Sequence, residues 1–451
     1  MPDTLKLAED FAPVATSDWE AAIRADLAGA DYQKKLVWRT PENIAVKPYY
    51  RREDLPLGPV GQTIVSCGLP GCGAAVPAGN EWQIAEPGSE PSDAIRADEF
   101  HNSGATAVQE LAFALAAGVD RLAAGDEHAT FVYAVGSNYF FEIAKLRAAR
   151  LLWAQAAKAF DKTVPISIYA RTATANKSLY DPYTNLLRVT TEALSAVLGG
   201  CDALIVEPFE FPDRLATNVH LLLKHEAHLN QVADPAAGSY YIEWLTDALA
   251  REAWKLFQQV ESQGGNTQTF IENSIAVSRK ASEAAVASRR RILVGVNNYP
   301  DLQETTVSKD AAVRFAWRLA EPLERIRMRT ERHANATGHT PVVLLLTRGD
   351  VKMRIARATF CANFFGCGGF TIKESAQLEP SDLVALCSSD SEYLALAKEI
   401  VAQVKVPVIV AGNPKDQIQA LTEAGVAGFV HVFSNVVDTL TEWQTKIGVA
   451  A

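Results

Sequence analysis

The fold of this chain of 451 residues is constrained most by two series of short apolar runs. Each run is followed by a segment of helix length. Runs such as TFVYAV at 130–135 and ALIV at 203–206 alternate with segments whose apolar residues recur at helical spacing. Strands that alternate with helices form βαβ units around a parallel sheet. The chain is therefore predicted to belong to the α/β class.

The first series runs from about residue 104 to residue 300 and contains about four strand–helix units. A closed (β/α)8 barrel needs eight units, typically in about 250 residues. We therefore expect a TIM-barrel-like domain that is either incomplete or completed by strands hidden in weakly patterned N-terminal segments. The expected strands are Glu81–Ala85, Thr130–Val135, Val164–Tyr169, Ala203–Val206 and Leu293–Val296, and the expected helices are Ala105–Ala123, Phe140–Phe160, Asn185–Leu198, Arg214–Leu229, one after Ser239 to about Val260 and one through Arg290.

The second series, at 341–447, contains five apolar runs separated by helical segments, which predicts a doubly wound domain of flavodoxin-like type. Its expected strands are VVLLL, GFTI, LVALC, VPVIVA and GFVHV, and its expected helices are 350–364, 391–403, 414–424 and 435–446. The predicted organisation is a leader and partner-contact segment at 1–60, a shortened barrel-like domain at 61–300, a linker with a helix at 301–340 and the flavodoxin-like domain at 341–451.

Charge and composition argue against several classes of protein. The net charge of −10 disfavours broad binding to nucleic acid or to anionic membranes. No stretch approaches the ~20 apolar residues of a membrane span, and the N-terminus does not have the pattern of a signal peptide. The six cysteines contain no C-x-x-C pair, which predicts reduced thiols in a cytoplasmic protein. His220, His225 and His228 have no nearby acidic ligand, so no metal site is expected.

Several long segments, in order, resemble the acyl-CoA mutases, and most closely the small subunits of methylmalonyl-CoA mutases. The length of the collinear match carries this resemblance, since no short motif could. The matching segments are SDWEAAIRADLAGADYQKKLVWRT, HNSGATAVQELAFALAAGVDRL, FVYAVGSNYFFEIAKLRAARLLW, DPYTNLLRVTTEALSAVLGGCDALIVEPF, RLATNVHLLLKHEAHLNQVADPAAGSYYIEWLTDALAREAWKLF and ATFCANFFGCGGF.

The resemblance implies a barrel that binds a CoA ester at the carboxyl ends of its strands, and a flavodoxin-like domain that carries adenosylcobalamin. In the catalytic chains of this family the cofactor starts a radical rearrangement between methylmalonyl-CoA and succinyl-CoA, while the protein excludes water and positions the reacting groups.

This sequence departs from the catalytic pattern in its second domain. Catalytic chains carry D-x-H-x-x-G after the first strand, and the histidine binds cobalt. Aligned on Asp350, the histidine position holds Lys352 and the glycine position holds Ile355. A protonated lysine has no lone pair for a metal. We therefore expect no catalytic, cofactor-binding or metal-binding residue in this chain, and interpret Asp350 as a helix N-cap.

The barrel also departs from the family pattern. Where catalytic chains resemble H-x-Q-T-S-G-W, this chain has ARTATANKSLYDPY at 170–183. Arg171 and Lys177 are left either to pair with an anion or to form surface ion pairs. The N-terminal half of the family's barrel, with its active-site tyrosine, is mostly absent, which suggests an internal deletion.

Three hypotheses follow. The first is a non-catalytic small subunit that forms a heterodimer with a large cobalamin-bearing subunit; helices at 140–160 and 184–198 are candidate contact surfaces. The second is a substrate barrel that takes cobalamin from a separate chain. The third is a stand-alone remnant that binds CoA esters, in which an unpaired sheet edge would favour aggregation or recruit a partner.

Overall fold

The computed structural model describes residues 11–12, 14–55, 79–265, 267–304 and 317–449. The chain separates into two compact units, Met1–Ile64 and Val65–Ala451. No described helix is both long and apolar enough to cross a membrane.

The N-terminal unit consists of two helices and a small hairpin. Its elements are α1 (Thr16–Asp26), α2 (Tyr32–Leu36), the antiparallel strands β1 (Trp38–Arg39) and β2 (Ala45–Val46), and the 3-10 turn η1 (Arg52–Asp54). Helix α2 begins after Asp31 because the Asp31 side chain accepts a hydrogen bond from the Lys34 backbone N–H at 2.8 Å.

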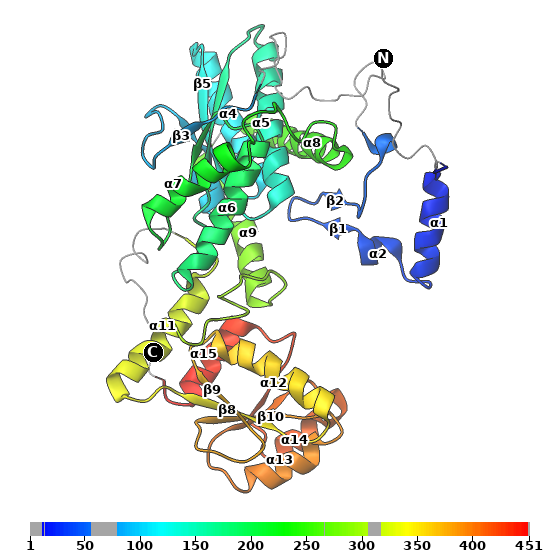
Figure 1. Ribbon diagram of the computed structural model, residues 1–451, viewed down its shortest axis with the longest axis vertical. Helices are drawn as coiled ribbons and strands as arrows, with labels where there is room; N and C mark the ends of the chain where they lie inside the picture. The colour runs from blue at the N-terminus through cyan, green and yellow to red at the C-terminus, as the bar shows by residue number, and fades with distance from the viewer. Residues whose placement is uncertain (1–10, 13, 56–78, 266, 305–316, 450–451) are drawn as a thin grey trace. The chain divides into compact units, whose positions relative to one another are not determined.

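The first sheet of the larger unit has five parallel strands in the order β3-β7-β6-β5-β4. Figure 1 labels β3 and β5 of this sheet, with α4 and α5 beside it. The strands are β3 (Gln83–Ala85), β4 (Ile95–Arg96), β5 (Ala129–Val135), β6 (Ile166–Thr172) and β7 (Ala203–Ile205). The helices are α3 (Ala97–Asn102), α4 (Ala107–Ala124), α5 (Tyr139–Ala159), α6 (Pro182–Leu198), α7 (Asp213–Leu221), α8 (Tyr240–Ser262) and α9 (Gln268–Ala287). Within the described residues this sheet is open rather than a closed barrel.

Helices α4, α5 and α6 pack against the sheet, and α8 packs on α4 and α5. The approach of α4 to β5 depends on Gly118, because a Cβ atom there would lie 2.8 Å from the rings of both Phe131 and Trp153. Strand β5 is buried along its whole length, as expected for a central parallel strand.

One expectation for this region was confirmed in large part and one was wrong. The predicted helix Arg214–Leu229 is helical from Asp213 to Glu226, as α7 followed directly by a π-helical turn at Leu222–Glu226, and ends three residues earlier than expected. The predicted strand Leu293–Val296 is a turn, because the Asn297 side chain accepts from the Leu293 N–H at 2.8 Å and donates to the carbonyl of Arg291 at 2.8 Å. A side chain that bonds the nearby backbone in this way competes with strand pairing.

The second sheet has five parallel strands in the order β12-β11-β10-β8-β9. The strands are β8 (Val342–Thr347), β9 (Thr371–Ser375), β10 (Leu383–Cys387), β11 (Val408–Ala411) and β12 (Gly428–Val430), and the helical segments are α12 (Val351–Gly366), α13 (Tyr393–Val401), η3 (Lys415–Gln417), α14 (Ile418–Glu423) and α15 (Val436–Lys446). Alternate residues of β8 supply the two cores: Val343 and Leu345 pack with α12 and α15, whereas Leu344 and Leu346 pack with α13 and α14.

Helix α11 (Glu321–Thr337) contributes to the core of the second sheet and also contacts the first domain. Its Leu323 and Ile326 are buried in the core that contains α12 and α15. The Gln444 side chain of α15 donates to the Ile326 carbonyl at 2.7 Å. On the other side, the Glu324 carboxylate of α11 accepts from the Leu179 N–H at 2.7 Å. This helix therefore joins the segment after β6 to the C-terminal sheet.

Candidate functional sites

The carboxyl edge of the second sheet is the first candidate site. The chain leaves β8 into α12 on one face of the sheet and leaves β10 into α13 on the other face, so a topological switch point lies between these strands. Open parallel sheets bind ligands at this position. Asp350 stands there as the N-cap of α12, and its side chain accepts from the Met353 N–H at 2.8 Å. The interpretation of Asp350 as a helix N-cap is confirmed.

The two residues that replace the cobalt-ligand pattern are exposed on the first turns of α12. Lys352 is exposed, and the Ile355 side chain is 55% exposed. Within the described residues, no group of three or more His, Cys, Asp or Glu side chains is arranged to hold a metal ion. The side chains after β8 thus offer an ammonium group and an alkyl group where a ligand imidazole and a glycine would be needed.

All eight histidines of the chain lie in described parts, and none stands beside Asp350 at the switch point. His339 lies at the opposite edge of the sheet, where its Nε2 is 2.9 Å from the Asp382 carboxylate. His431 follows β12, the outer strand, which is three strand spacings, or roughly 14 Å, from β8. Its Nδ1 accepts from the Phe433 N–H at 3.2 Å, and burial together with the Arg357 charge lowers its pKa.

A carboxylate of the chain itself occupies the switch point. Glu392 Oε2 accepts hydrogen bonds from the backbone N–H groups of Asp350 and Ser389, both at 3.2 Å, and from the hydroxyls of Ser388 and Ser389, both at 2.6 Å. These hydroxyl and backbone donors lower the Glu392 pKa to about 2, so the group is anionic at neutral pH. An incoming anionic group would meet this negative charge and find these donors already engaged.

The carboxyl end of the first sheet is the second candidate site. Arg171, near the end of β6, contacts one Glu207 oxygen through Nη2 at 2.7 Å and through Nε at 3.1 Å. Its Nη1 lies 3.0 Å from Glu90. Arg96 of β4 binds both oxygens of Asp98 at 2.7 and 2.8 Å. The Arg171 cluster, meaning these five residues, contains two guanidinium groups and three carboxylates, so both guanidinium groups are paired and one negative charge is left over.

Lys177, the other cation proposed for anion binding, is not available at the surface. Its side chain is buried, with Nζ 2.7 Å from both oxygens of Glu192 and 2.8 Å from the Asn176 side-chain oxygen. Burial lowers the Lys177 pKa, and the Glu192 carboxylate offsets this only in part. The alternative of a surface ion pair was therefore wrong for Lys177: the pair is internal.

The structure contains a buried charge network around Lys145 that the sequence did not predict. Lys145 Nζ lies 2.6 Å from carboxylate oxygens of both Glu110 and Glu142 and donates to the Ala134 carbonyl at 2.6 Å. Glu110 also accepts from the Ala134 N–H at 2.9 Å. Strand β4 pairs with β5 only as far as Val132, so Glu110 and Lys145 satisfy the β5 backbone where its neighbour stops. His101 Nδ1 lies 3.1 Å from Glu110.

Other residues noted in the sequence have structural positions. His220 is buried, whereas His225 and His228 are exposed. The cysteines Cys201, Cys361, Cys367 and Cys387 are buried free thiols, and the other two, Cys67 and Cys72, lie outside the described residues.

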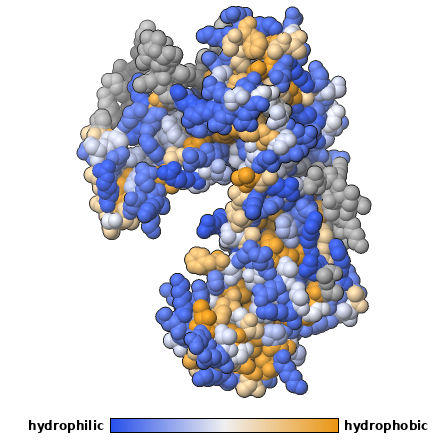
Figure 2. Space-filling model, turned by 180° about the vertical axis from the view of Figure 1, so that it is seen from behind, coloured by the Kyte–Doolittle hydropathy of each residue, from blue (hydrophilic) through white to orange (hydrophobic). Residues whose placement is uncertain are grey.

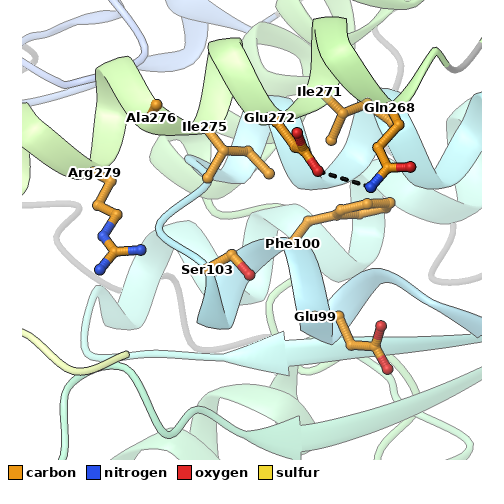
Figure 3. Close-up of a pocket in the computed structure, with 9 residues that line it drawn as sticks. All are labelled: Glu99, Phe100, Ser103, Gln268, Ile271, Glu272, Ile275, Ala276 and Arg279. Carbon is orange, nitrogen blue, oxygen red and sulfur yellow. Dashed lines mark hydrogen bonds between the residues drawn. The ribbon is translucent and has the colours of Figure 1, made fainter. Parts of the chain in front are cut away.

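A groove with a volume of about 540 Å³ lies between α3 and α9 (Figure 3). Phe100, Ile271 and Ile275 provide its apolar lining, and Glu99 and Arg279 are among its polar residues. Its volume is within the usual range of ligand pockets, roughly 300–1,000 Å³. None of its lining residues belongs to the Arg171 cluster or to the switch point of the second sheet.

Comparison with known proteins identifies the family. The model of the family described as methylmalonyl-CoA mutase matches residues 91–339. The methylmalonyl-CoA mutase small subunit of Porphyromonas gingivalis is 31% identical over 98% of this chain and 99% of its own length. The chain belongs to the methylmalonyl-CoA mutase family. The resemblance predicted from the sequence is confirmed.

Other family members match over part of their length. The small subunit of Streptomyces virginiae is 33% identical over 78% of this chain, and the probable small subunit of Mycobacterium tuberculosis is 32% identical over 77%. The matches cover 63% of each of these two relatives. The alignment with the P. gingivalis subunit extends over 617 positions, more than the 451 residues present here, so that relative has residues without a counterpart.

Proposed function

We propose that this chain is the small, non-catalytic subunit of a heterodimeric, adenosylcobalamin-dependent methylmalonyl-CoA mutase. The large subunit of the pair would interconvert methylmalonyl-CoA and succinyl-CoA. The observation that carries the proposal is the exposed Lys352 two residues after the N-cap Asp350, where cobalt coordination would require an imidazole.

The second domain supports this proposal as a degenerate cobalamin-type domain. Taken in chain order, its strands lie as 2-1-3-4-5, which is the order of flavodoxin-like folds. Its residues do not fit the cofactor, however. The Asp350 carboxylate caps α12 instead of orienting an imidazole, and Glu392 fills the switch point with a fixed negative charge. We therefore assign cobalamin to the partner and derive no reaction step in this chain.

The first domain also favours a non-catalytic role. Substrate binding by the family requires polar groups that can receive an acyl-CoA ester at the carboxyl ends of the strands. Here Arg171 is engaged by Glu90 and Glu207, and Lys177 is engaged by Glu192. This arrangement counts against the alternative in which the chain supplies a working substrate barrel.

Pairing with a large subunit is supported by the comparisons and by α6. Relatives of this chain are named as small subunits, and the large subunit of S. virginiae is 35% identical over 46% of this chain. On α6, Tyr183 and Leu187 are 70% and 69% exposed, whereas the charged Arg188 and Glu192 bond to the chain itself. Two large apolar side chains exposed one helical turn apart support α6 as a candidate contact surface. Helix α5, the other candidate contact surface, is mostly buried. Figure 2 shows apolar residues in separate patches on one face of the molecule.

Within this proposal, residues 1–60 act as a leader and partner-contact segment, 61–300 as a shortened barrel, 301–340 as a linker with a helix, and 341–451 as the degenerate domain. The four buried free cysteines favour a reducing, cytoplasmic location.

Co-purification with cofactor quantitation tests the proposal. The chain is co-expressed with the large subunit encoded in the same genome, and the cobalamin content of the complex is measured from its absorbance. We expect a stable one-to-one complex with one cobalamin per pair, and no mutase activity or bound cobalamin in the chain alone. Stoichiometric binding of adenosylcobalamin by the isolated chain would overturn the proposal.

A further inference from the structure

We infer that the carboxyl end of the first sheet holds a latent carboxylate-binding site centred on Arg171, which the chain's own Glu90 and Glu207 keep closed. The inference deepens the proposed function, on which it rests for the non-catalytic role of this domain. In this inference, Glu90 and Glu207 exclude anionic ligands from the carboxyl end of the sheet.

The position of Arg171 is that of a ligand-binding residue. Its backbone is paired with Ala134 of β5 on one side and with Ile205 of β7 on the other, so it lies on a central strand. It is the penultimate residue of β6, close to the edge where parallel α/β sheets bind ligands. The neighbouring strands fix the backbone of Arg171 at this edge, and the carboxylates of Glu90 and Glu207 hold its guanidinium group.

The contacts of Arg171 resemble those of an arginine that binds an anion. Nε and Nη2 both donate to one Glu207 oxygen, and Nη1 donates to Glu90. Glu207 comes from the segment that follows β7, and Glu90 precedes β4. A guanidinium group presents its donors in a fixed fork that suits carboxylates, so Glu90 and Glu207 occupy the directions a ligand carboxylate would use.

Charge and burial explain why the site is closed. The side chains of Glu90 and Glu207 are each 7% exposed and that of Asp98 is 3% exposed, compared with 19% for Arg171. With two guanidinium groups against three carboxylates, the Arg171 cluster has a formal charge of −1. An anionic ligand would therefore have to displace a shielded carboxylate from Arg171 and enter a negative environment. Replacing both glutamates by glutamine changes the formal charge to +1 and keeps the side-chain volumes nearly constant.

The chemistry points to carboxylates rather than phosphates. The groups that now satisfy the guanidinium fork are two separate carboxylates, from Glu90 and Glu207, and Arg96 is 3.3 Å from Glu90 on the far side. A small dicarboxylate can replace two such groups, whereas one phosphate presents its oxygens from a single centre. Methylmalonate is therefore the probe, and inorganic phosphate is the comparison anion.

The test is a calorimetric titration of the full chain, alone and in complex with the large subunit, with methylmalonate. The Glu90→Gln, Glu207→Gln double variant is expected to bind methylmalonate at least about tenfold more tightly than the wild-type chain, and more tightly than it binds phosphate. Adding Arg171→Gln should abolish the gain. Glu99→Gln, which removes an exposed carboxylate on the neighbouring α3, is the matched control and should bind as the wild type does.

Two results would overturn the inference: a wild-type chain that binds methylmalonate as tightly as the double variant, or a folded double variant that gains no affinity. Equal gain for phosphate would overturn the carboxylate assignment. Circular dichroism and thermal unfolding establish whether the double variant folds. If it does not, Glu207→Gln alone replaces it, and the absence of any gain in that variant overturns the inference. If the inference about Arg171 fails, the measurements of bound cobalamin and of complex formation with the large subunit are unaffected. The proposed function is therefore judged separately.

Discussion

The Glu324 carboxylate on α11 accepts the backbone N–H of Leu179 at 2.7 Å, across 145 residues of sequence. The same oxygen lies 2.7 Å from the Arg318 guanidinium, and both charged side chains are almost fully buried. Leu179 belongs to the segment that follows β6. One buried carboxylate therefore holds this segment to α11 and offsets a buried cation.

We predict that Glu324→Ala destabilises the chain by about 3–5 kcal/mol, because it leaves the Arg318 charge buried without its partner. Urea unfolding followed by fluorescence measures the effect. Glu321→Ala is the control: it removes a partner from the exposed pair with Arg325 on the same helix, and should change the free energy of unfolding by less than about 1 kcal/mol. Similar losses for the two variants would contradict the assignment.

The buried network around Lys145 gives a second prediction. Burial disfavours the charged lysine, but the carboxylates of Glu110 and Glu142 outweigh this effect and raise its pKa. Lys145→Met should therefore destabilise the chain by about 3–5 kcal/mol, since it leaves two buried carboxylates and the Ala134 carbonyl without their common donor. Lys255→Met, at an exposed pair with Glu252, is the matched control and should be nearly neutral.

The free energy of unfolding of the chain should decrease as the pH is lowered, because of His220. Burial lowers the His220 pKa from 6.5 to about 4, and its Nδ1 has no hydrogen-bond partner among the described residues. Between these two pH values the unfolded chain binds more protons than the folded chain, so stability is lost as the pH falls from 6.5 toward 4. Over the whole interval, the lowered His220 pKa reduces the free energy of unfolding by about 3 kcal/mol. In His220→Gln, the difference in unfolding free energy between pH 7 and pH 4.5 should shrink; an unchanged difference would count against this cause.

The capping role of Asp350 gives a fourth prediction. Asp350→Ala should lower the free energy of unfolding by about 1 kcal/mol, because the Met353 N–H loses its acceptor, whereas Asp350→Asn should cost little. Guanidinium unfolding of the chain measures both. If Asp350→Asn lowered the free energy of unfolding as much as Asp350→Ala, the carboxylate charge of Asp350, and not its capping hydrogen bond, would be what stabilises the chain.

The second sheet could be predicted largely from sequence because its buried parallel strands appear as continuous apolar runs. The expected strand LVALC corresponds to β10, Leu383–Cys387, and the five strands occur where the pattern placed them. Strand β4 was missed because its two residues, Ile95 and Arg96, are too few to form a pattern. The turn at Leu293–Val296 was misinterpreted as a strand because its apolar residues concealed the effect of Asn297.

The candidate sites were predicted less completely than the fold. Asp350 could be recognised as a cap because capping is local, between a side chain and an N–H three residues later. The partners of Arg171 could not be recognised, since Glu90 and Glu207 lie 81 and 36 residues away in the sequence. Only the pairing of strands brings these residues together, so the sequence left open whether Arg171 was free for a ligand.

The position of α11 determines where the chain can be divided. A fragment that began at Pro341 would contain every strand of the C-terminal sheet but would lack Leu323 and Ile326, and so would leave the side of that core next to α15 uncovered. A fragment that began before Glu321 would keep the helix but would leave Glu324 and Arg318 without Leu179 and the segment around it. Limited proteolysis should therefore release the C-terminal domain intact only when the cut falls on the N-terminal side of α11, and its yield reports how firmly α11 belongs to that domain.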